Sequence, residues 1–421
     1  MKVLLHAWGS RGDVQPALAL ALRLQERGHR VAIAAMVDFG DWIRGHGVTF
    51  EPIETDLAEL SATPAGRRYL GGSASTLDDL NGLRRFLAAA AGPLAAMLVR
   101  TRHDYDAVVT NPITLEATLC LSLSPSVGLS CAMLQPGVAS ADARSTMYAV
   151  RPGRSIVNQM AGGAATIYLR HVLRPVVDAT VRLAGASRLS WAGYIRRTSQ
   201  VQYFLASSPL VTPVAADWPV PIEATGFWQL PPDPRWEPDP HLAEFLTVGP
   251  PPIYVGFGSA PTNDAGDMSR LIRAVVTKMG LRAVVLRGTA GLAIDHPAVL
   301  LIDAVPHDWL FPRTSVAVSH GGAGTTAAAL TAGTPQVVVP HMADQPFWGR
   351  RVHELGVSPA PIPAHQMTAD ALALAIEEAQ SAAHRRAAMA LAEQLRDETG
   401  TANAVAALER QWSVGLARGR R

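Results

Sequence analysis

The amino-acid sequence predicts an α/β protein made of two Rossmann-like, doubly wound domains, each with a mostly parallel sheet. Three observations predict this fold class. Short apolar runs alternate with segments of helical periodicity, the alternation starts twice along the chain, and a proline-rich stretch separates the two starts. The length of 421 residues is sufficient for two large domains. Two such domains facing each other would leave a cleft lined by the carboxyl ends of both sheets, where ligands bind in this fold class.

The first half of the chain opens with a βαβ unit. An apolar run at residues 3–7 predicts a strand, and the polar turn at residues 9–13 leads into a helical pattern over residues 17–24. Gly28 ends this helix, because glycine is the residue most often found just beyond a helix C-terminus. The apolar run at residues 31–35 then predicts the second strand.

The second half repeats the pattern. A strand is predicted at residues 253–257, a turn at 258–259, a helix from about 268 to 279, and a returning strand at 283–286. Further strands follow at residues 300–302, 316–319 and 336–339, the middle one leading through a glycine-rich loop into a helix. Strands that alternate with helices in this way form open parallel sheets with helices on both faces.

The domain boundary is indicated by composition. Nine prolines fall between Pro209 and Pro240, and such a segment cannot be a helix or an inner strand. We therefore predict an N-terminal domain over residues 1–212 and a proline-rich linker over 213–240. A C-terminal domain is predicted over 241–395, followed by a helix and tail at 396–421 that pack back on the N-terminal domain.

Composition and charge exclude several classes of protein. With 48% hydrophobic and 17% charged residues the chain has ample apolar surface for a core, which excludes a disordered protein. A net charge of +2 gives no global field for nucleic acid, so no nucleic-acid partner is expected. Only Lys2 and Lys278 are lysines, and neither stands where a lysine nucleophile is expected.

The cysteines and the apolar stretches favour a cytoplasmic protein. Cys120 and Cys131 form no disulfide framework, and we expect both thiols to be buried. The first residues are too short an apolar run for a signal peptide. Two long stretches without charge, residues 117–141 and 314–343, contain prolines and glycines that a membrane helix would not accommodate, so they predict buried strands joined by tight loops.

The segment from Val316 to Thr326 carries the most specific signal. A strand ends in His320 and a loop of small residues that opens a helix, so backbone N–H groups and the positive end of the helix can face an anion. Phosphate is the natural ligand, and His320 and Thr325 add donors. The alternative is a tight turn that needs glycine for its backbone angles alone. Neither the P-loop motif nor G-x-G-x-x-G nor the G-x-S-x-G elbow occurs.

These residues resemble a known family. The sequence from His320 to Thr326, followed by Pro340-His-Met-Ala-Asp-Gln-Pro, resembles the donor-binding signature of inverting, nucleotide-sugar-dependent glycosyltransferases with the GT-B fold. Gly9-Ser-Arg-Gly-Asp-Val-Gln-Pro is similar to the N-terminal signature of their bacterial natural-product and sterol glucosyltransferase branch, which includes enzymes that glycosylate glycopeptide antibiotics. Thr225-Gly-Phe-Trp and Gly256-Phe-Gly-Ser also match this branch. The resemblance covers nearly the whole chain and is weakest from about residue 133 to 204, on the acceptor side.

The resemblance implies a UDP- or dTDP-hexose donor, no further cofactor and no metal. It places the nucleobase at Val305 and His307, and the hydroxyls of a glucose-like sugar on Asp344 and Gln345. The alternative for Asp344 is a cap on the helix that follows, which is compatible with sugar binding, and Trp309 is expected in the core. The other donor-binding residues implied by the resemblance are Ser10, Ser259, His320, Gly322, Ala323, Gly324 and Thr325. The Asp-Tyr-Asp triplet at residues 104–106 is interpreted as a solvated turn and not as a metal site.

Asp13 is the expected catalytic residue. It stands where the wider family usually carries a histidine that takes the proton of the acceptor, so an aspartate replaces the usual base. A carboxylate is far more acidic than an alcohol, so it can accept the proton only late, as the new oxygen–carbon bond forms. The alternative is that Asp13 is simply the N-cap of the first helix, with Pro16 in its first turn.

The acceptor side carries a charge imbalance. Nine arginines between Arg144 and Gln200 face one acid, Asp178. This segment is either a solvated face or a functional surface that attracts an anionic or phenolic lipophilic acceptor, or that rests on an anionic bilayer. The expected acceptor-binding residues are Met147, Tyr148, Arg151 and Trp191.

The sequence thus predicts a metal-independent inverting hexosyltransferase that acts on a hydroxyl of a lipophilic small molecule such as a polyketide, phenolic, sterol-like or peptide antibiotic aglycone. Two alternatives remain open at this point. One is a nucleotide-sugar 2-epimerase, which shares the fold. The other is a peripheral lipid-binding or scaffolding protein that retains the fold without turnover.

Overall fold

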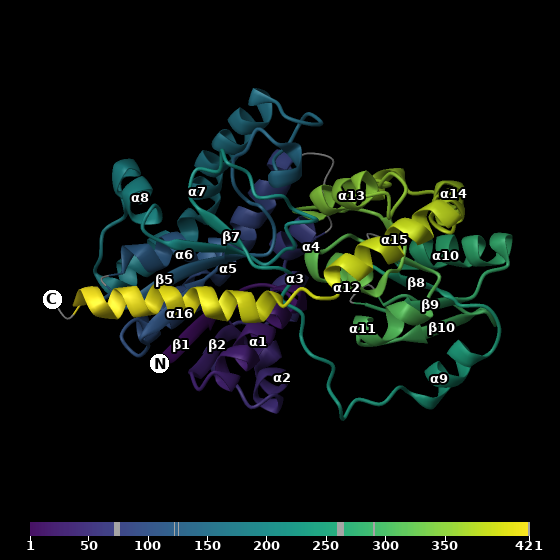
Figure 1. Cartoon of the computed structure of the whole chain (residues 1–421), viewed down its shortest axis with the longest axis horizontal. Helices are drawn as coiled ribbons and strands as arrows, with labels where there is room; N and C mark the ends of the chain where they lie inside the picture. Colours follow the sequence, from purple (N-terminus) through teal and green to yellow (C-terminus); the bar gives the residue numbers. More distant parts are fainter. Residues whose placement is uncertain (71–75, 122, 125, 259–264, 289–290, 420–421) are drawn as a thin grey trace. The chain divides into compact units, whose positions relative to one another are not determined.

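The computed structural model describes residues 1–70, 76–121, 123–124, 126–258, 265–288 and 291–419 (Figure 1). The chain divides into two compact units, and each is built on one parallel sheet, which confirms the predicted fold class. The first unit holds Met1–Tyr69, Leu77–Leu230 and Thr399–Arg421. The second holds Pro231–Glu398 together with Leu70–Thr76.

The sheet of the first unit has the strand order β3-β2-β1-β4-β5-β6-β7, and every pair is parallel. Strands β1 and β4 are neighbours although two strands separate them in the sequence, so the order reverses between them and creates a switch point at their carboxyl ends. The strands are β1 (Lys2–His6), β2 (Arg30–Met36), β3 (Thr49–Ile53), β4 (Ala107–Thr110), β5 (Gly128–Met133), β6 (Gln202–Leu205) and β7 (Ile222–Ala224).

Helices cover both faces of this sheet, each over its own apolar cluster. One cluster joins α1 and α16 to the sheet, and the other joins α5 and α7 to it. The helices are α1 (Arg11–Glu26), α2 (Gly40–Gly45), α3 (Leu57–Ala62), α4 (Pro64–Leu70), α5 (Thr76–Thr101), α6 (Pro112–Cys120), α7 (Ile156–Ala184), α8 (Trp191–Thr198) and α16 (Gly400–Gly419), with 3-10 turns at Val37–Phe39 and Ala143–Ser145.

Helix α5 is long and apolar enough, over residues 78–101, to cross a membrane by length and composition alone. Half of that window is buried within the first unit. Phe86, Leu87 and Leu94 of this helix pack in the cluster beneath the sheet, so its apolar character is accounted for by the core.

The sheet of the second unit has the order β10-β9-β8-β11-β12 and is also parallel throughout. Its order reverses between β8 and β11. The strands are β8 (Ile253–Gly256), β9 (Ala283–Leu286), β10 (Val299–Ile302), β11 (Val316–Ser319) and β12 (Gln336–Val338). The helices are α9 (Pro240–Thr247), α10 (Ala265–Met279), α11 (His307–Leu310), α12 (Ala323–Ala332), α13 (Gln345–Glu354), α14 (Ala369–Ala379) and α15 (Ala382–Leu395), with 3-10 turns at Phe311–Arg313 and Ala364–Gln366.

The first uncharged stretch contains more helix than the sequence predicts, because it includes the end of α6 before β5. Its small residues gave this segment no clear period, because helices that are buried on most sides lose the alternation of apolar and polar faces. In the second stretch, α12 is the helix expected after the glycine-rich loop. Both cysteines are free and buried, as expected.

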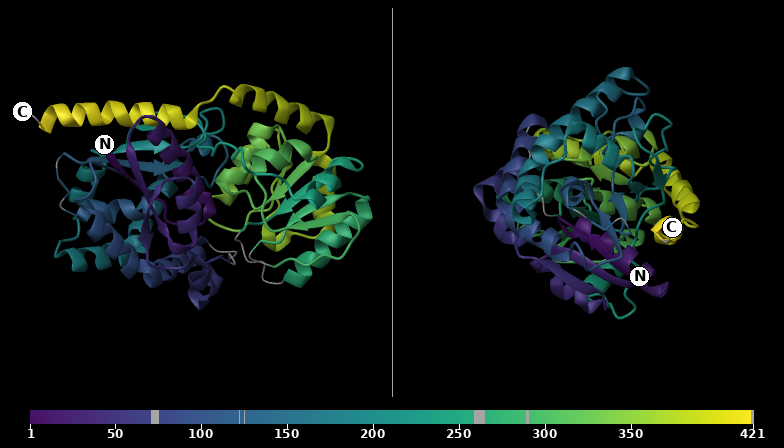
Figure 2. Two further views of the ribbon diagram at one scale, coloured as in Figure 1. Left: turned by 90° about the horizontal axis from the view of Figure 1, so that it is seen from below. Right: turned by 90° about the vertical axis from the view of Figure 1, so that its left-hand side faces the viewer.

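Helix α16 returns to the first unit after the chain has built the second (Figures 1 and 2). It packs against α1 and β5, with Leu408 and Trp412 buried in the cluster there. Two glycines permit this close approach. A Cβ atom on Gly128 would lie 2.5 Å from the Trp412 ring, and one on Gly400 would lie 2.2 Å from the carbonyl oxygen of Phe227.

Candidate active site

The switch point of the second sheet presents an open helix N-terminus. Strand β11 ends at Ser319, and three residues later α12 begins with Gly322 as its N-cap. Among the residues that the structure describes, no side chain caps this helix, and its first turn contains no acidic residue. The first backbone N–H groups of α12 and the positive end of its dipole are therefore available to an anion.

His320 lies at the entrance of this turn, closely surrounded by glycines. A Cβ atom on Gly322 would lie 2.6 Å from Nε2 of His320, and one on Gly258 would lie 3.0 Å from its Cε1 atom. Burial, with a smaller contribution from His341, lowers the pKa of His320 to about 4. The imidazole is therefore neutral at pH 7, and a bound anion would favour its protonated form.

Asp344 and Gln345 follow β12 in a tight turn. Asp344 occupies the N-cap position of α13, but its side chain makes no capping hydrogen bond. Its Oδ2 atom instead accepts a hydrogen bond from Nε1 of Trp348 over 2.7 Å. Burial raises the pKa of Asp344, and the bond from Trp348 opposes this shift. The sequence alternative of a simple helix cap therefore does not describe the role of this carboxylate.

The oxygen end of the Gln345 side-chain amide already accepts hydrogen bonds within the protein. Its Oε1 atom accepts hydrogen bonds from the backbone N–H groups of His341, over 2.7 Å, and Met342, over 3.1 Å. Gln345 can consequently offer a ligand the donor end of its amide. The preceding Ala343 has a φ of 55°, the only positive value of a non-glycine residue in the described part of the chain. Such strain concentrates at functional sites.

The proposed base-recognition segment follows β10. The Nε2 atom of His307 lies 3.1 Å from the hydroxyl of Tyr254, and its ring stacks on Phe311 with centroids 4.5 Å apart. Through Tyr254 of β8, the His307 side chain thus connects this segment to the sheet. Val305 is half-buried against the apolar cluster that contains Tyr254 and Phe311. Trp309 packs on Trp236 with ring centroids 5.0 Å apart. Ser259 lies outside the described residues.

The switch point of the first sheet holds Asp13. The N-cap of α1 is Ser10, and Asp13 stands three residues later, in the first turn. The two residues form a capping box, in which Oδ2 of Asp13 accepts from the Ser10 backbone N–H over 2.8 Å. The alternative that Asp13 is the N-cap is wrong, because the Ser10 hydroxyl takes that role. Gly9 has a φ of 136°, and a Cβ atom there would lie 2.1 Å from Oδ2 of Asp13.

A second polar group at this switch point was not predicted. Nδ1 of His6, at the end of β1, lies 3.0 Å from the hydroxyl of Thr114, which also contacts Oδ1 of Asn111 over 3.1 Å. Asn111 caps α6, which follows β4. Burial lowers the pKa of His6 to about 3. The sequence feature that could have indicated this group is the Asn-Pro pair at the start of α6, because such a pair is common at helix starts.

Two of the predicted acceptor-binding residues, Met147 and Tyr148, lie close to the same glycine, Gly137. A Cβ atom on Gly137 would lie 3.7 Å from the hydroxyl of Tyr148 and 3.9 Å from Sδ of Met147. Trp191 lies on α8, where its ring stacks on Tyr194 with centroids 5.8 Å apart. Arg151 is exposed in the loop before α7.

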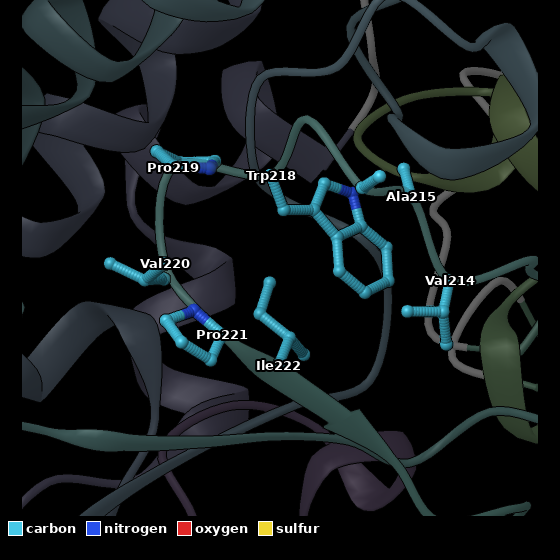
Figure 3. A pocket seen from close by; sticks show the side chains of 8 residues that line it. Val214, Ala215, Trp218, Pro219, Val220, Pro221 and Ile222 are labelled. Carbon is cyan, nitrogen blue, oxygen red and sulfur yellow. The ribbon is translucent and has the colours of Figure 1, made fainter.

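A cavity of about 350 Å³ lies in the first unit near these loops (Figure 3). The residues that line it are all of apolar types, Trp218, Pro219 and Ile222 among them, while polar atoms contribute a large share of the surface. Nε1 of Trp218 donates to the carbonyl oxygen of Ser145 over 2.9 Å. The sequence predicted a linker over residues 213–240, which includes all the residues of this lining, so the cavity was not foreseen.

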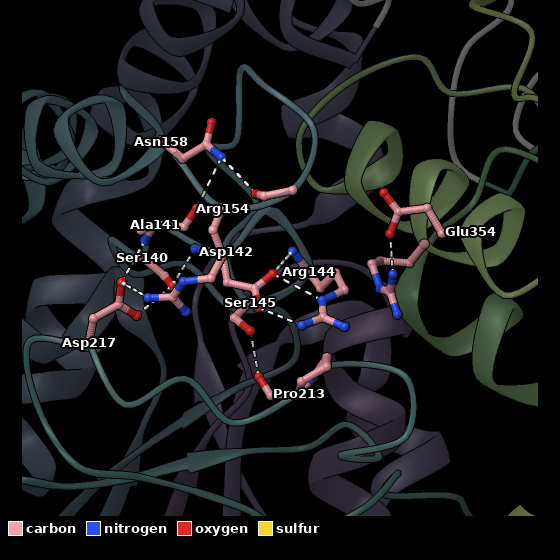
Figure 4. A network of polar contacts seen from close by, with 12 residues as sticks. Ser140, Ala141, Asp142, Arg144, Ser145, Arg154, Asn158, Pro213, Asp217 and Glu354 are labelled. Carbon is pink, nitrogen blue, oxygen red and sulfur yellow. Dashed lines mark hydrogen bonds and ion pairs between the residues drawn. The ribbon is translucent and has the colours of Figure 1, made fainter. Parts of the chain in front are cut away.

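The arginine-rich segment is far less basic in the fold than in the sequence. Acids from other segments pair with it, so Asp178 is not its only counter-charge. Arg144 binds Asp142, and Arg154 lies 3.7 Å from Asp217 (Figure 4). Arg170 makes a bidentate ion pair with the buried Glu116.

The Asp-Tyr-Asp triplet also has structural partners. Oδ2 of Asp106 accepts from the backbone N–H of Lys2 over 2.7 Å, and the Tyr105 hydroxyl donates to Glu51 over 2.7 Å. Among the residues that the structure describes, no group of three or more His, Cys, Asp or Glu side chains is placed to hold a metal ion.

Comparison with known proteins decides the family. Residues 3–99 match the glycosyltransferase family 28 N-terminal domain, and residues 284–409 match the C-terminal domain of erythromycin biosynthesis protein CIII-like proteins. The chain is 31% identical to the sterol 3-beta-glucosyltransferase UGT80B1 of Arabidopsis thaliana over 97% of its own length and 68% of that protein. The chain belongs to the GT-B glycosyltransferases.

Other members of this family show how far the likeness extends. The sterol 3-beta-glucosyltransferase UGT80A2 of the same plant is 31% identical over 97% of this chain, but the chain spans only 65% of its length. The crystal structure of the glycosyltransferase VinC in complex with DTDP has a TM-score of 0.64 at 18% identity, covering 98% of this chain and all of VinC. This structural likeness supports the GT-B fold.

Apart from Ser10 and Ser259, the donor-binding residues predicted for a GT-B glycosyltransferase fall on three turns at one end of the second sheet. These turns follow β10, β11 and β12, and they carry Val305, His320 and Asp344 respectively. Because the carboxyl ends of parallel strands lie at one edge of a sheet, the three turns lie at the same edge. Asp13 and Ser10 lie at the corresponding edge of the first sheet.

Proposed function

We propose that this glycosyltransferase moves a glucose-like hexose from a UDP- or dTDP-sugar to a hydroxyl group of a lipophilic acceptor, with inversion and without a metal. Sterols and natural-product aglycones are the acceptor classes suggested by the names of its relatives. The chain spans about two thirds of the plant relatives, so their activity is carried over here only as part of this proposal.

The reaction is a single displacement. The acceptor oxygen attacks C1 of the hexose, the bond from C1 to the diphosphate oxygen breaks, and the acceptor proton passes to the carboxylate of Asp13. The Ser10 backbone N–H fixes Oδ2 of this carboxylate. A fixed carboxylate needs little reorganisation as the proton arrives, which lowers the barrier.

The observation that carries the proposal is the open N-terminus of α12. Gly322 brings no side chain, the first turn has no acid, and His320 lies against its backbone. Oriented N–H groups stabilise the charge that develops on the leaving diphosphate, which is the task of a metal ion in other enzymes. Asp344 and the Gln345 amide would bind the sugar hydroxyls, and a sugar that lacks them would leave buried polar groups unpaired.

An acceptor panel tests this function directly. The purified protein is incubated with UDP-glucose or dTDP-glucose and with sterol, phenolic and polyketide acceptors, and products are detected by their hexose mass shift. We expect transfer to at least one lipophilic alcohol, a product of inverted anomeric configuration by NMR, and an unchanged rate in excess chelator. Transfer that chelator abolishes and magnesium restores would contradict metal independence. A product without inversion would contradict the single displacement.

A further inference from the structure

One face of α7 exposes an apolar stripe. Ile156, Met160 and Ile167 have 65%, 67% and 61% of their surfaces exposed, and the spacing of four and seven residues puts them on the same side of the helix. Val150, in the loop before the helix, is 65% exposed. Large side chains exposed in a contiguous row usually mark an interaction surface, whereas single exposed apolar residues need no explanation.

The same surface carries positive charge. Arg151 and Arg154 are exposed in the loop next to Val150, and Arg174, which lies 3.9 Å from Asp178, continues the face of the stripe. No acidic residue occurs in the sequence between Asp142 and Asp178. Arg154 lies 3.7 Å from Asp217, and within the described part of the chain no carboxylate forms an ion pair with Arg151.

The loop is held in place by a buried asparagine (Figure 4). Oδ1 of Asn158 accepts from the backbone N–H groups of Val150 and Arg151 over 3.0 and 2.9 Å. Its Nδ2 atom donates to the carbonyl oxygens of Ala141, over 3.2 Å, and Arg151, over 3.0 Å. Because the loop is already ordered, binding through Val150 and Arg151 would lose little conformational entropy.

We propose that residues 150–154 and the exposed face of residues 156–167, together the α7 surface, bind an anionic lipid bilayer. The apolar side chains enter the boundary between headgroups and acyl chains, and the arginines pair with the acidic headgroups. This combination of an apolar stripe and flanking arginines is typical of helices that lie in a membrane interface. A second copy of the chain fits less well, because a two-fold contact through this surface would bring like charges together.

Vesicle flotation tests this surface without any donor chemistry, so its result does not depend on the proposed glycosyl transfer. The whole protein is mixed with phosphatidylcholine vesicles that contain either no anionic lipid or about 30% phosphatidylserine. We expect the protein to float with the anionic vesicles and not with the neutral ones. Raising the ionic strength from about 0.01 M to about 1 M shortens the Debye length from about 30 Å to about 3 Å and should release most of it.

Two variants and two matched controls locate the contact. Met160→Gln combined with Ile167→Gln should lower the vesicle partition coefficient at least about tenfold, because the apolar contribution is lost. Arg151→Glu should lower it about thirtyfold, since one charge near such a surface contributes about 1 kcal/mol and reversal counts twice. Met389→Gln, at a residue 68% exposed in the second unit, and Arg386→Glu on the same helix should change it less than twofold.

Three results would overturn the proposal. They are no binding to either vesicle, equal loss in the control variants, and a lipid-free dimer in analytical ultracentrifugation that the Met160→Gln, Ile167→Gln variant abolishes. Circular dichroism and the thermal midpoint of each variant show that it is folded, since all the changed side chains are exposed and their replacement should leave stability nearly unchanged.

Discussion

The backbone N–H of Ser10 and the carboxylate of Asp13 are joined by a hydrogen bond of 2.8 Å, with Asp13 three residues into the helix that Ser10 caps. One carboxylate oxygen therefore stabilises the start of α1 in the resting protein. Capping and catalysis are compatible roles for Asp13, because a carboxylate has two oxygens and several lone pairs. The two roles can be separated by variants that keep the cap and remove the base.

Asp13→Asn is the first such variant. The asparagine oxygen can still accept from the Ser10 N–H, so the helix start should persist, but the amide cannot take a proton. We expect the turnover number to fall by about 10² or more, with the affinity for the nucleotide sugar nearly unchanged. Steady-state kinetics and donor titration measure the two quantities.

Ser10→Ala is the control for that experiment. It removes the capping hydroxyl, so it should cost about 0.5–2 kcal/mol of stability. It leaves the backbone N–H that holds Asp13. Near-normal turnover in Asp13→Asn would leave Asp13 only its structural role.

Gly9→Ala tests whether the position of Asp13 matters. The new Cβ atom would lie 2.1 Å from Oδ2 of Asp13, at a φ of 136° that is unfavourable for alanine. We expect transfer to fall at least about tenfold as the carboxylate is displaced. Gly28→Ala is the matched control, because Gly28 has a φ of 82° and open space around it. It should cost about 1–2 kcal/mol of stability and leave turnover intact; equal losses of activity in both would refute the positional argument.

The buried His320 gives a pH dependence of known sign. Its pKa is about 4 in the folded protein against 6.5 in the unfolded chain, so only the unfolded state takes up a proton as the pH falls below 6.5. Its contribution to stability is complete above pH 6.5 and is lost as the pH falls toward 4. His320→Asn should therefore flatten the decline of the thermal midpoint of unfolding between those two pH values.

Donor binding should reverse this shift at the same histidine. A diphosphate beside His320 favours the charged imidazole, so UDP binding should take up protons at pH 6. Calorimetry in buffers of different ionisation enthalpy measures this uptake, with His320→Asn as the control. Binding without proton uptake in the wild type would show that the diphosphate does not lie next to this ring.

Truncation of Arg170 should lower the free energy of unfolding much more than truncation of Arg174. Arg170→Ala leaves Glu116 buried without its partner, and breaking a buried pair costs about 3–5 kcal/mol. Arg174 lies 3.9 Å from Asp178 and is half exposed, so Arg174→Ala should cost less than about 1 kcal/mol. Chemical denaturation followed by circular dichroism compares them. Similar losses would mean that the Glu116 pair is no more than a surface contact.

Short-range patterns in the sequence predicted the features that depend on a few neighbouring residues. Residues 283–286 and 316–319 were placed as strands at the bounds that the structure shows, because buried parallel strands are short continuous apolar runs. The alternative that Asp13 caps α1 named the wrong residue of the Ser10 and Asp13 pair, because both types favour helix starts and only the backbone geometry separates them.

Long-range partners could not be predicted in this way. Arg170 and Glu116 are 54 residues apart, and His6 and Thr114 are 108 residues apart. No periodicity in one sequence links such positions, so the arginine-rich segment seemed more basic than it is. The cavity beside Trp218 was missed for another reason, since its walls come from one short stretch whose prolines indicated only a linker.

The return of α16 imposes an order on synthesis. The first unit leaves the ribosome first, but Leu408 and Trp412, which cover one side of its sheet, are made only after the second unit. The second unit can complete its sheet while the first still has an uncovered apolar surface over α1 and β5. The unit that begins first is thus finished last, and until then this surface is exposed to chaperones and to other nascent chains. A fragment that stops at Leu230 would retain that exposure permanently, because a cut at the proline-rich stretch separates the first unit from a helix of its own core.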